Sequence, residues 1–274
     1  MQYFSPTPKG FRQLALWGST ALLTALAALP LAHPSFAQSS LPNLADWQEA
    51  GFTPSVDTSA DRTTSGATRS IVTAVEVAAL TPQHNLYGVT VRPDPSLMLY
   101  LTAASSERFV YLALEDAATG DIIHEQELLV ESRSGFLQIQ LPTTTMGESL
   151  LEPGQDYRWD VTVYDDAEGR FVAGTVMGYI SYLPSDAVDW TDPETLTNLE
   201  ELPSYEQGTY LFSNYIWYDG VAALTQAYQT NPEAVVADLQ TVLSISGLEE
   251  TEIQKILKTM ADDQAFLAAE VGEF

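Results

Sequence analysis

The chain has 274 residues, of which 37 are Asp or Glu, 11 are Lys or Arg and none is cysteine. The lack of cysteine excludes thiol nucleophiles, thiolate metal sites, iron–sulfur clusters and lipid attachment to an N-terminal cysteine. The formal net charge of −26 argues against a nucleic-acid partner, because phosphate backbones are held through Lys and Arg.

Residues 1–37 have the features of an export signal. Two basic residues precede an uncharged, mostly apolar stretch over 14–32, and Ser35 and Ala37 place small residues where signal peptidase cleaves. We therefore predict export to the periplasm or the extracellular medium, with cleavage after Ala37. The alternative is an uncleaved membrane anchor, which Pro30 disfavours by interrupting the apolar stretch. Peripheral association of the mature chain with a membrane stays open.

Residues 38–69 are rich in Ser, Thr, Pro, Ala and Asp and lack hydrophobic periodicity, which predicts a flexible tether. Removal of residues 1–37 leaves 9 basic residues against 37 acidic ones, a net charge of −28. These acids are spread along the chain, a pattern typical of a solvated surface.

Residues 70–184 contain short β-branched and aromatic runs separated by turn residues. In the run over 157–165, Tyr157 and Trp159 alternate with polar residues, which predicts one buried and one exposed strand face. Gly120 and Gly169 stand where hairpin loops need positive φ. With no interposed helices, these runs predict an immunoglobulin-like antiparallel β-sandwich. The eight runs are 70–80, 87–91, 97–103, 108–114, 121–130, 135–141, 157–165 and 170–183.

Residues 185–274 have a helical rhythm. We predict a short helix opening at 192–194, a long one over 204–229, another from Pro232 to Gly247, and a third long helix that follows it. The middle pair resembles one tetratricopeptide-type unit, but no second copy occurs at a fixed period. Because such repeats need about three copies to bury a core, we expect this segment to pack on the sandwich.

Within the long predicted helix, Trp217, Val221, Leu224 and Tyr228 recur at spacings that place them on one face. The stretch Trp217-Tyr218-Asp219 at its middle has two interpretations. Exposed, it is a docking surface for a partner; buried against the strands, it is a structural latch.

Short motifs follow one another along the chain: Leu80-Thr81-Pro82, Gly88-Val89-Thr90 before Pro93 and Pro95, Leu151-Glu152-Pro153-Gly154 before Tyr157 and Trp159, Gly178-Tyr179, Ile216-Trp217-Tyr218-Asp219, Asn231-Pro232 and Gly247-Leu248. In this order they resemble a family of exported cyanobacterial proteins, domain of unknown function 928. The resemblance covers residues 60–260 and implies export and this two-part architecture. It implies no activity, and the cysteines that many members carry in the sandwich are absent here.

Two acidic loops of the predicted sandwich are calcium candidates, because calcium takes six to eight oxygen ligands in irregular geometry. Neither loop has the spacing of an EF-hand, and plain hairpin turns are the competing interpretation. Calcium is the one cofactor that we consider. The candidate ligands are Glu115, Asp116, Asp121, Asp165, Asp166 and Glu168.

Catalysis has little support. His84 and His124 are the histidines left after signal removal, and no nucleophile motif accompanies them. A carboxylate pair drawn from Asp160 and the neighbouring acidic loop is the remaining route to a hydrolase.

We therefore predict a non-catalytic binding or protein-interaction module of the cell envelope. Its partner is another envelope protein or a glycan, for which Tyr164 is an outward-facing aromatic candidate. The alternatives are an envelope-associated structural protein and, third, a carboxylate-dependent hydrolase.

Overall fold

The computed structural model describes residues 41–42, 46, 77–104, 106–144, 148–262, 267 and 269–271. The predicted export signal at 1–37 lies outside these residues, as does most of the predicted tether at 38–69. Leu41, one of the described residues within the tether, is buried in the hydrophobic core.

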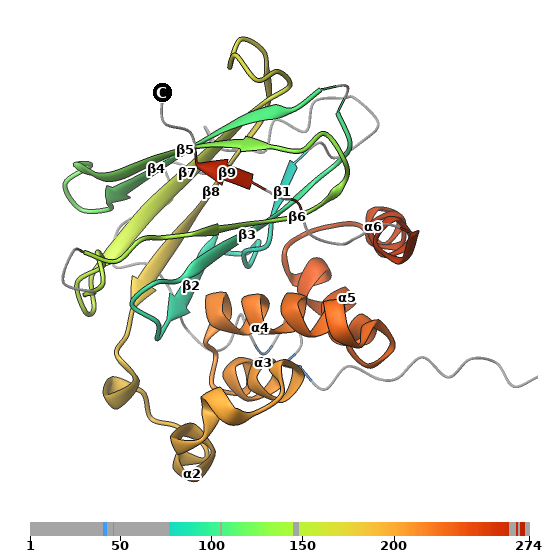
Figure 1. The fold of residues 1–274 in the computed structure, drawn as a ribbon. Coiled ribbons are helices and arrows are strands. Elements are labelled where there is room, and N and C mark those ends of the chain that lie inside the picture. Colours follow the sequence, from blue (N-terminus) through green and yellow to red (C-terminus); the bar gives the residue numbers. More distant parts are fainter. Residues whose placement is uncertain are drawn as a thin grey trace, which may run out of the picture. The chain divides into compact units, whose positions relative to one another are not determined.

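The described strands form two sheets (Figure 1). Each of the eight predicted runs contains a strand, and a ninth strand, β9, arises in the segment predicted as helical. The smaller sheet has the order β1-β3-β6, with β1 at Val77–Ala79, β3 at Ser96–Leu101 and β6 at Gly135–Gln140. The larger has the order β2-β8-β7-β4-β5-β9, with β2 at Tyr87–Thr90, β8 at Val172–Tyr182, β7 at Asp156–Tyr164, β4 at Arg108–Asp116, β5 at Ile122–Val130 and β9 at Ala269–Val271.

One strand pair differs from the antiparallel prediction, because β2 runs parallel to β8. Before β2 the chain leaves the three-stranded sheet through a turn in which Leu86 has φ of 60°, a sparsely populated conformation for a bulky residue. The carbonyl of Leu86 accepts a hydrogen bond from the backbone N of Tyr179 at 2.7 Å. This turn brings β2 to the edge of the six-stranded sheet alongside β8.

The alternation predicted for β7 is confirmed. Tyr157, Trp159, Val161 and Val163 are buried, and the residues between them are partly exposed. The predicted hairpin glycines also have positive φ, 75° at Gly120 and 68° at the β7–β8 turn. Both sheets contribute their inward side chains to one hydrophobic core.

The helical segment follows β8. The short predicted helix is α2 (Pro193–Thr197), and Asp192 caps it by accepting a hydrogen bond from the backbone N of Glu194 at 3.1 Å. Helix α5 (Pro232–Ile245) begins at Pro232 as predicted and ends before Gly247, whose φ is 86°. The predicted third long helix is α6 (Glu250–Asp262), and short 3-10 turns occupy Ser185–Ala187 and Leu199–Glu201.

The single helix predicted over 204–229 is wrong. The chain forms two helices there, α3 (Ser204–Ser213) and α4 (Trp217–Thr230), because Tyr215 has φ of 60° and leaves the helical region. Apolar residues continue across this break, and neither Gly nor Pro stands at it.

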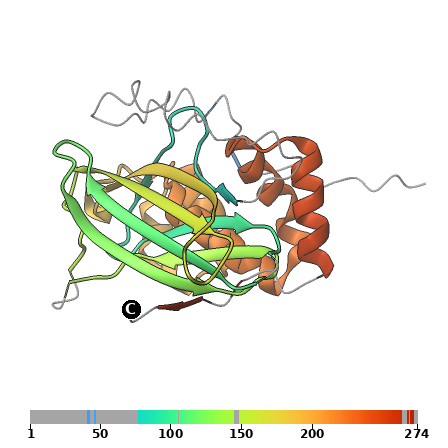
Figure 2. The same ribbon diagram turned by 90° about the horizontal axis from the view of Figure 1, so that it is seen from above.

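Helix α4 joins the helical segment to the strands. It contacts β2 and β3, and both views of the ribbon show it on the side of the sheets where these strands lie (Figure 1, Figure 2). Trp217, Val221, Leu224 and Tyr228 are all buried in the core that the strands share. No helix in the described part of the chain has the length and apolar character needed to cross a membrane.

Candidate functional site

The stretch Trp217-Tyr218-Asp219 forms the first turn of α4. Its side chains are almost completely buried, with 0%, 2% and 5% of their surface exposed. Each makes a polar contact with a different segment near the strands. We call these three residues the α4 anchor.

Trp217 connects α4 to the segment that follows β1. Its indole Nε1 donates a hydrogen bond to the carbonyl of Leu80 at 2.8 Å. Its ring also meets Phe212 of α3 edge-on, with 5.4 Å between ring centroids. Gly88 of β2 makes room for this turn, since a Cβ there would lie 3.0 Å from Trp217 Cβ and 2.8 Å from Tyr218 Cε2. The backbones of β2 and α4 therefore approach more closely than any larger residue at position 88 allows.

Tyr218 connects α4 to β7 and β8. Its hydroxyl donates to the carbonyl of Tyr179 at 2.8 Å and accepts a hydrogen bond from Nε1 of Trp159 at 2.8 Å. Burial raises the pKa of this hydroxyl far above its usual value, which keeps it a neutral donor. Gly178 leaves space for the indole, because a Cβ there would lie 2.6 Å from Cζ2 of Trp159.

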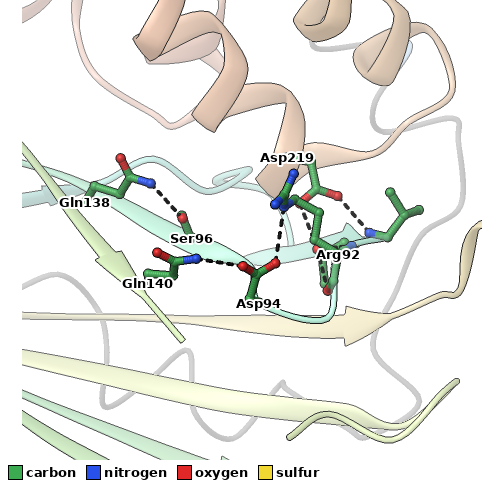
Figure 3. Close-up of polar contacts among 8 residues, drawn as sticks. Arg92, Asp94, Ser96, Gln138, Gln140 and Asp219 are labelled. Carbon is green, nitrogen blue, oxygen red and sulfur yellow. Dashed lines mark hydrogen bonds and ion pairs between the residues drawn. The ribbon is translucent and has the colours of Figure 1, made fainter. Parts of the chain in front are cut away.

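Asp219 connects α4 to the end of β2 (Figure 3). Its carboxylate accepts a hydrogen bond from Thr90 Oγ1 at 2.9 Å and one from the backbone N of Val91 at 2.7 Å. Burial raises the pKa of Asp219 to about 6, although these donors and Arg92 favour the charged form. The position in the first helical turn also suits a negative charge.

A second group of polar side chains lies beside Asp219 (Figure 3). Arg92 donates to Asp94 at 3.3 Å, and Gln140 Nε2 donates to the other oxygen of Asp94 at 2.8 Å. Gln138 Nε2 donates to Ser96 Oγ at 2.8 Å. These contacts link β6 to the loop between β2 and β3 and to the first residue of β3. They contain no nucleophile and base within hydrogen-bonding distance of one another.

The six calcium candidates lie in two hairpins at opposite ends of the larger sheet. β4 and β7 are antiparallel, and their register places Asp116 opposite Tyr157 at one end and Val110 opposite Val163 near the other. Asp116 accepts hydrogen bonds from the backbone N atoms of Ala118 and Thr119, at 2.8 and 2.9 Å. Glu115 and Asp121 belong to the Asp116 hairpin, and Asp165, Asp166 and Glu168 belong to the other.

Arginines accompany the acids of the β7–β8 hairpin. Arg108, with 2% of its surface exposed, pairs with Asp165 at 3.2 Å. Arg170 pairs with Asp166 at 2.8 Å and with Glu168 at 3.1 Å. Within the described ranges, no three His, Asp or Glu side chains gather closely enough to hold a metal ion.

The carboxylates considered for hydrolysis have arginine partners. Asp160 forms an ion pair with Arg158 at 2.9 Å, and Asp165 faces the buried Arg108. His124 lies on β5, on the strand face that includes Gln126. His84 lies in the turn before β2, far along the chain from both acids.

The larger sheet also has a partly exposed surface, of which the sequence indicated only Tyr164 as a binding candidate. On its outer face, β2 and β8 are covered by the chain after β8, where Tyr179 and Met177 pack with Trp190, Leu211 and Ile216 in a second hydrophobic cluster. Over β4, β5 and β7 the outer side chains other than Ala113 are exposed or only partly buried. We call this surface the open sheet face; it comprises Phe109, Tyr111, Glu125, Asp160, Thr162 and Tyr164.

Register brings the aromatics of the open sheet face together. Tyr111 lies opposite Thr162, and the rings of Phe109 and Tyr164 are 5.5 Å apart between centroids. The Tyr111 hydroxyl donates to Glu125, which raises the pKa of Tyr111 to about 12. Period-2 alternation along 108–114 places Phe109 and Tyr111 on the outward face of β4, as it places Tyr164 on the outward face of β7. The sequence pattern therefore contains a signal for this surface.

Comparison with known families gives one match, to Domain of Unknown Function (DUF928), over residues 63–256. The chain belongs to this family. The matched residues include β1 to β8 and reach into α6, so that the open sheet face and the α4 anchor are both within the family region. No curated protein matches the chain.

Proposed function

We propose that this DUF928 protein is a non-catalytic protein-interaction module of the cell envelope, and that it binds its partner through the open sheet face. The observation that carries the proposal is the distribution of exposed side chains. The three side chains of the α4 anchor are buried and form hydrogen bonds within the protein. Aromatic and carboxylate side chains on β4, β5 and β7 are at least partly accessible. Aromatic residues with polar neighbours are enriched in protein interfaces.

The fold that we propose is immunoglobulin-like. In such domains one sheet contains strands A, B and E, and the other contains G, F and C, with C′ added in variable types. The order β1-β3-β6 matches A-B-E, and β8-β7-β4-β5 matches G-F-C-C′. On this correspondence, the surface we propose for binding lies on strands C′, C and F.

One tyrosine supports this correspondence. Tyr157 stands near the start of β7, and its hydroxyl accepts a hydrogen bond from the backbone N of Glu152 at 2.8 Å. Immunoglobulin-type domains have such a tyrosine corner at the start of strand F, two residues before the second cysteine of the disulfide. Here Trp159 occupies that second position, and its buried indole fills the core in place of a disulfide.

The proposed location follows from the N-terminal sequence. The basic residues, the apolar stretch and the small residues at Ser35 and Ala37 support export with cleavage after Ala37. The motif order shared with exported cyanobacterial proteins supports a bacterial envelope as the site of action. A purely structural envelope protein is the alternative, and it needs no accessible binding face.

Site-specific cross-linking tests the proposal. A photoreactive residue replaces Thr162 on the open sheet face and, as the matched control, Lys258 on the exposed side of α6. In cells that export the protein, we expect one dominant adduct from position 162 and none from position 258. The adduct should disappear in a Tyr111→Ser, Tyr164→Ser variant that retains the wild-type melting temperature. Equal labelling from both positions, or none from position 162, would contradict the proposed surface.

A further inference from the structure

The open sheet face ends at β5, whose outer edge is only partly covered by the residues that the structure describes. Along one edge, β5 pairs with β4 over almost the whole length of β5. On the other side, β9 pairs with Leu128, Leu129 and Val130 alone. In the described part of the chain, no strand pairs with the outer edge of residues 122–127. Unpaired strand edges offer backbone N–H and C=O groups to an added strand.

The side chains at this edge include two exposed isoleucines. Ile122 has 54% and Ile123 38% of its surface exposed, and they are two of the four large apolar residues that are exposed in the described part of the chain. The register between β4 and β5 is irregular at this point, where Glu115 pairs with Ile122 and Ile123 is left out of the pairing. An added strand therefore meets exposed apolar surface at the start of this edge. Isolated apolar residues on a surface are ordinary, but a pair at an open strand edge favours pairing.

The charges at this edge have one sign. Glu125 and Glu127 are two residues apart and therefore lie on the same outer side of the sheet, that of the open sheet face, where Glu115 and Asp160 add further carboxylates. Arg158 pairs with Asp160 at 2.9 Å and with Glu115 at 3.9 Å, whereas no ion pair with Glu125 or Glu127 is formed within the described residues. Basic side chains opposite Glu125 and Glu127 gain favourable cross-strand pairs, whereas carboxylates there are repelled.

Two polar atoms lie on the other face of the same stretch. His124 Nε2 and Gln126 Oε1 are buried atoms that have no hydrogen-bond partner in this structure. Buried polar atoms of this kind are rare in folded proteins, and small hydroxyl or amide side chains from an added strand would supply partners for them.

We propose that the outer edge of residues 122–127 binds an extended, basic segment of a partner protein, which adds a strand to the larger sheet. β9 shows that this edge accepts an antiparallel strand, since it pairs in that sense with the final three residues of β5. A second copy of β5 is the wrong occupant, because it would bring the carboxylates of both edges together in a protein of net charge −26 before signal removal. The inference rests on the proposed function in taking a protein as the partner.

Synthetic peptides test this inference with the mature protein. The probe is an eight-residue peptide of alternating Lys and Val with blocked ends. One control peptide has Glu in place of Lys, and another has N-methyl groups on alternate backbone amides, which retains the charge but removes edge hydrogen bonds. Binding is measured by fluorescence anisotropy, and protection is measured by hydrogen exchange of the amides in 122–127.

We expect the Lys peptide to bind and to slow exchange in 122–127, and both control peptides to bind at least tenfold more weakly. The Glu125→Lys, Glu127→Lys variant should lose at least tenfold affinity for the Lys peptide. The Glu200→Lys, Glu201→Lys variant makes the same charge change at exposed residues elsewhere and should bind as the wild type does.

Equal binding of the N-methylated peptide, or equal binding by the two charge variants, would overturn the inference and indicate non-specific attraction. If the peptide does not bind but the cross-link from position 162 still forms, the inference about the strand edge is wrong and the open sheet face stands as the binding surface. Loss of the cross-link with specific peptide binding would remove the face and retain the edge.

Discussion

Three consecutive residues at the start of α4 make separate contacts with the chain around the strands. Trp217 bonds to Leu80, Tyr218 to Tyr179, and Asp219 to Thr90 and Val91. Because buried polar groups are costly without partners, this pattern fixes the position of the helix as well as its burial. The contacts join residues more than 35 positions apart in the sequence, so a one-dimensional pattern does not contain them.

The side chain of Trp217 should be required for stability. Trp217→Ala removes a fully buried indole and should lower the free energy of unfolding by about 3–5 kcal/mol. Trp217→Phe preserves most of the packing and loses the bond to Leu80, and it should cost about 1 kcal/mol beyond the lost volume. Urea denaturation of the mature protein measures both. An unchanged midpoint for Trp217→Ala would mean that α4 does not depend on this contact.

Asp219 should make stability depend on pH in a defined window. Its pKa of about 6 exceeds the ordinary value of 3.8, and the folded state therefore holds the proton more tightly than the unfolded state. Its contribution is fully present below the unfolded pKa of 3.8, falls as the pH rises through the folded pKa of about 6, and levels off once the folded carboxyl is ionised.

Comparison of the wild type with Asp219→Asn isolates this effect from the other acids. Between pH 4 and 6 the wild type should lose stability relative to the variant, by at most about 1.4 kcal/mol per pH unit. From pH 6.5 to 8 the difference should be level. A difference that does not change with pH between 4 and 6 would show that Asp219 titrates normally.

At the level of elements, the sequence pattern predicts a strand or helix correctly where the element has one solvent-exposed face and one buried face. The alternation of Tyr157 and Trp159 correctly predicted the buried face of β7, and Pro232 correctly predicted the start of α5. The break at Tyr215 was missed because positive φ at a non-glycine residue is imposed by packing around it.

Pairing between distant elements was less predictable. β2 pairs in parallel with β8, and β9 pairs with β5. Both pairings depend on where the chain crosses between sheets, and the periodicity of hydrophobic residues does not contain that information. The sequence identified the α4 anchor as a candidate site. Its two interpretations, a docking surface and a structural latch, differ in whether the residues are buried, and burial depends on the fold. The open sheet face was within reach of the alternation argument, since Phe109 and Tyr111 follow the same period as Tyr164.

At Gly88, where β2 and α4 approach each other closely, we expect even one added methyl group to destabilise the fold. Gly88→Ala places a Cβ 2.8 Å from Tyr218 Cε2 and should cost about 1–3 kcal/mol through overpacking. Gly120→Ala is the control, because its Cβ meets nothing within 4 Å and introduces only the strain of φ at 75°. Thermal melting of both variants should show the larger loss for Gly88→Ala. The reverse order would place the close approach elsewhere.

On the scale of the whole chain, sheets and helices share one hydrophobic core. The buried residues of β3, β4, β6 and β7 belong to the same cluster as those of α4, α5 and α6. The segment 185–274 carries a net charge of −15, which opposes its compaction in isolation. We therefore expect strands and helices to unfold together.

Export should remove the N-terminal segment. In a host that exports the protein, intact mass and N-terminal sequencing should give Gln38 as the first residue, because Ser35 and Ala37 fit the signal peptidase. A mature chain that begins with Met1 would assign the protein to the anchored class and move its folded part to a membrane surface.

Native-state hydrogen exchange tests most directly whether α4 is an integral part of the strand core. The amides of Leu224 in α4 and Val161 in β7 are both buried and should exchange only through global unfolding. We predict equal free energies of opening and equal denaturant dependence for the two. Exchange of Leu224 at a clearly lower free energy than Val161 would show that the helices detach while the sheets stay folded, and would contradict the anchor.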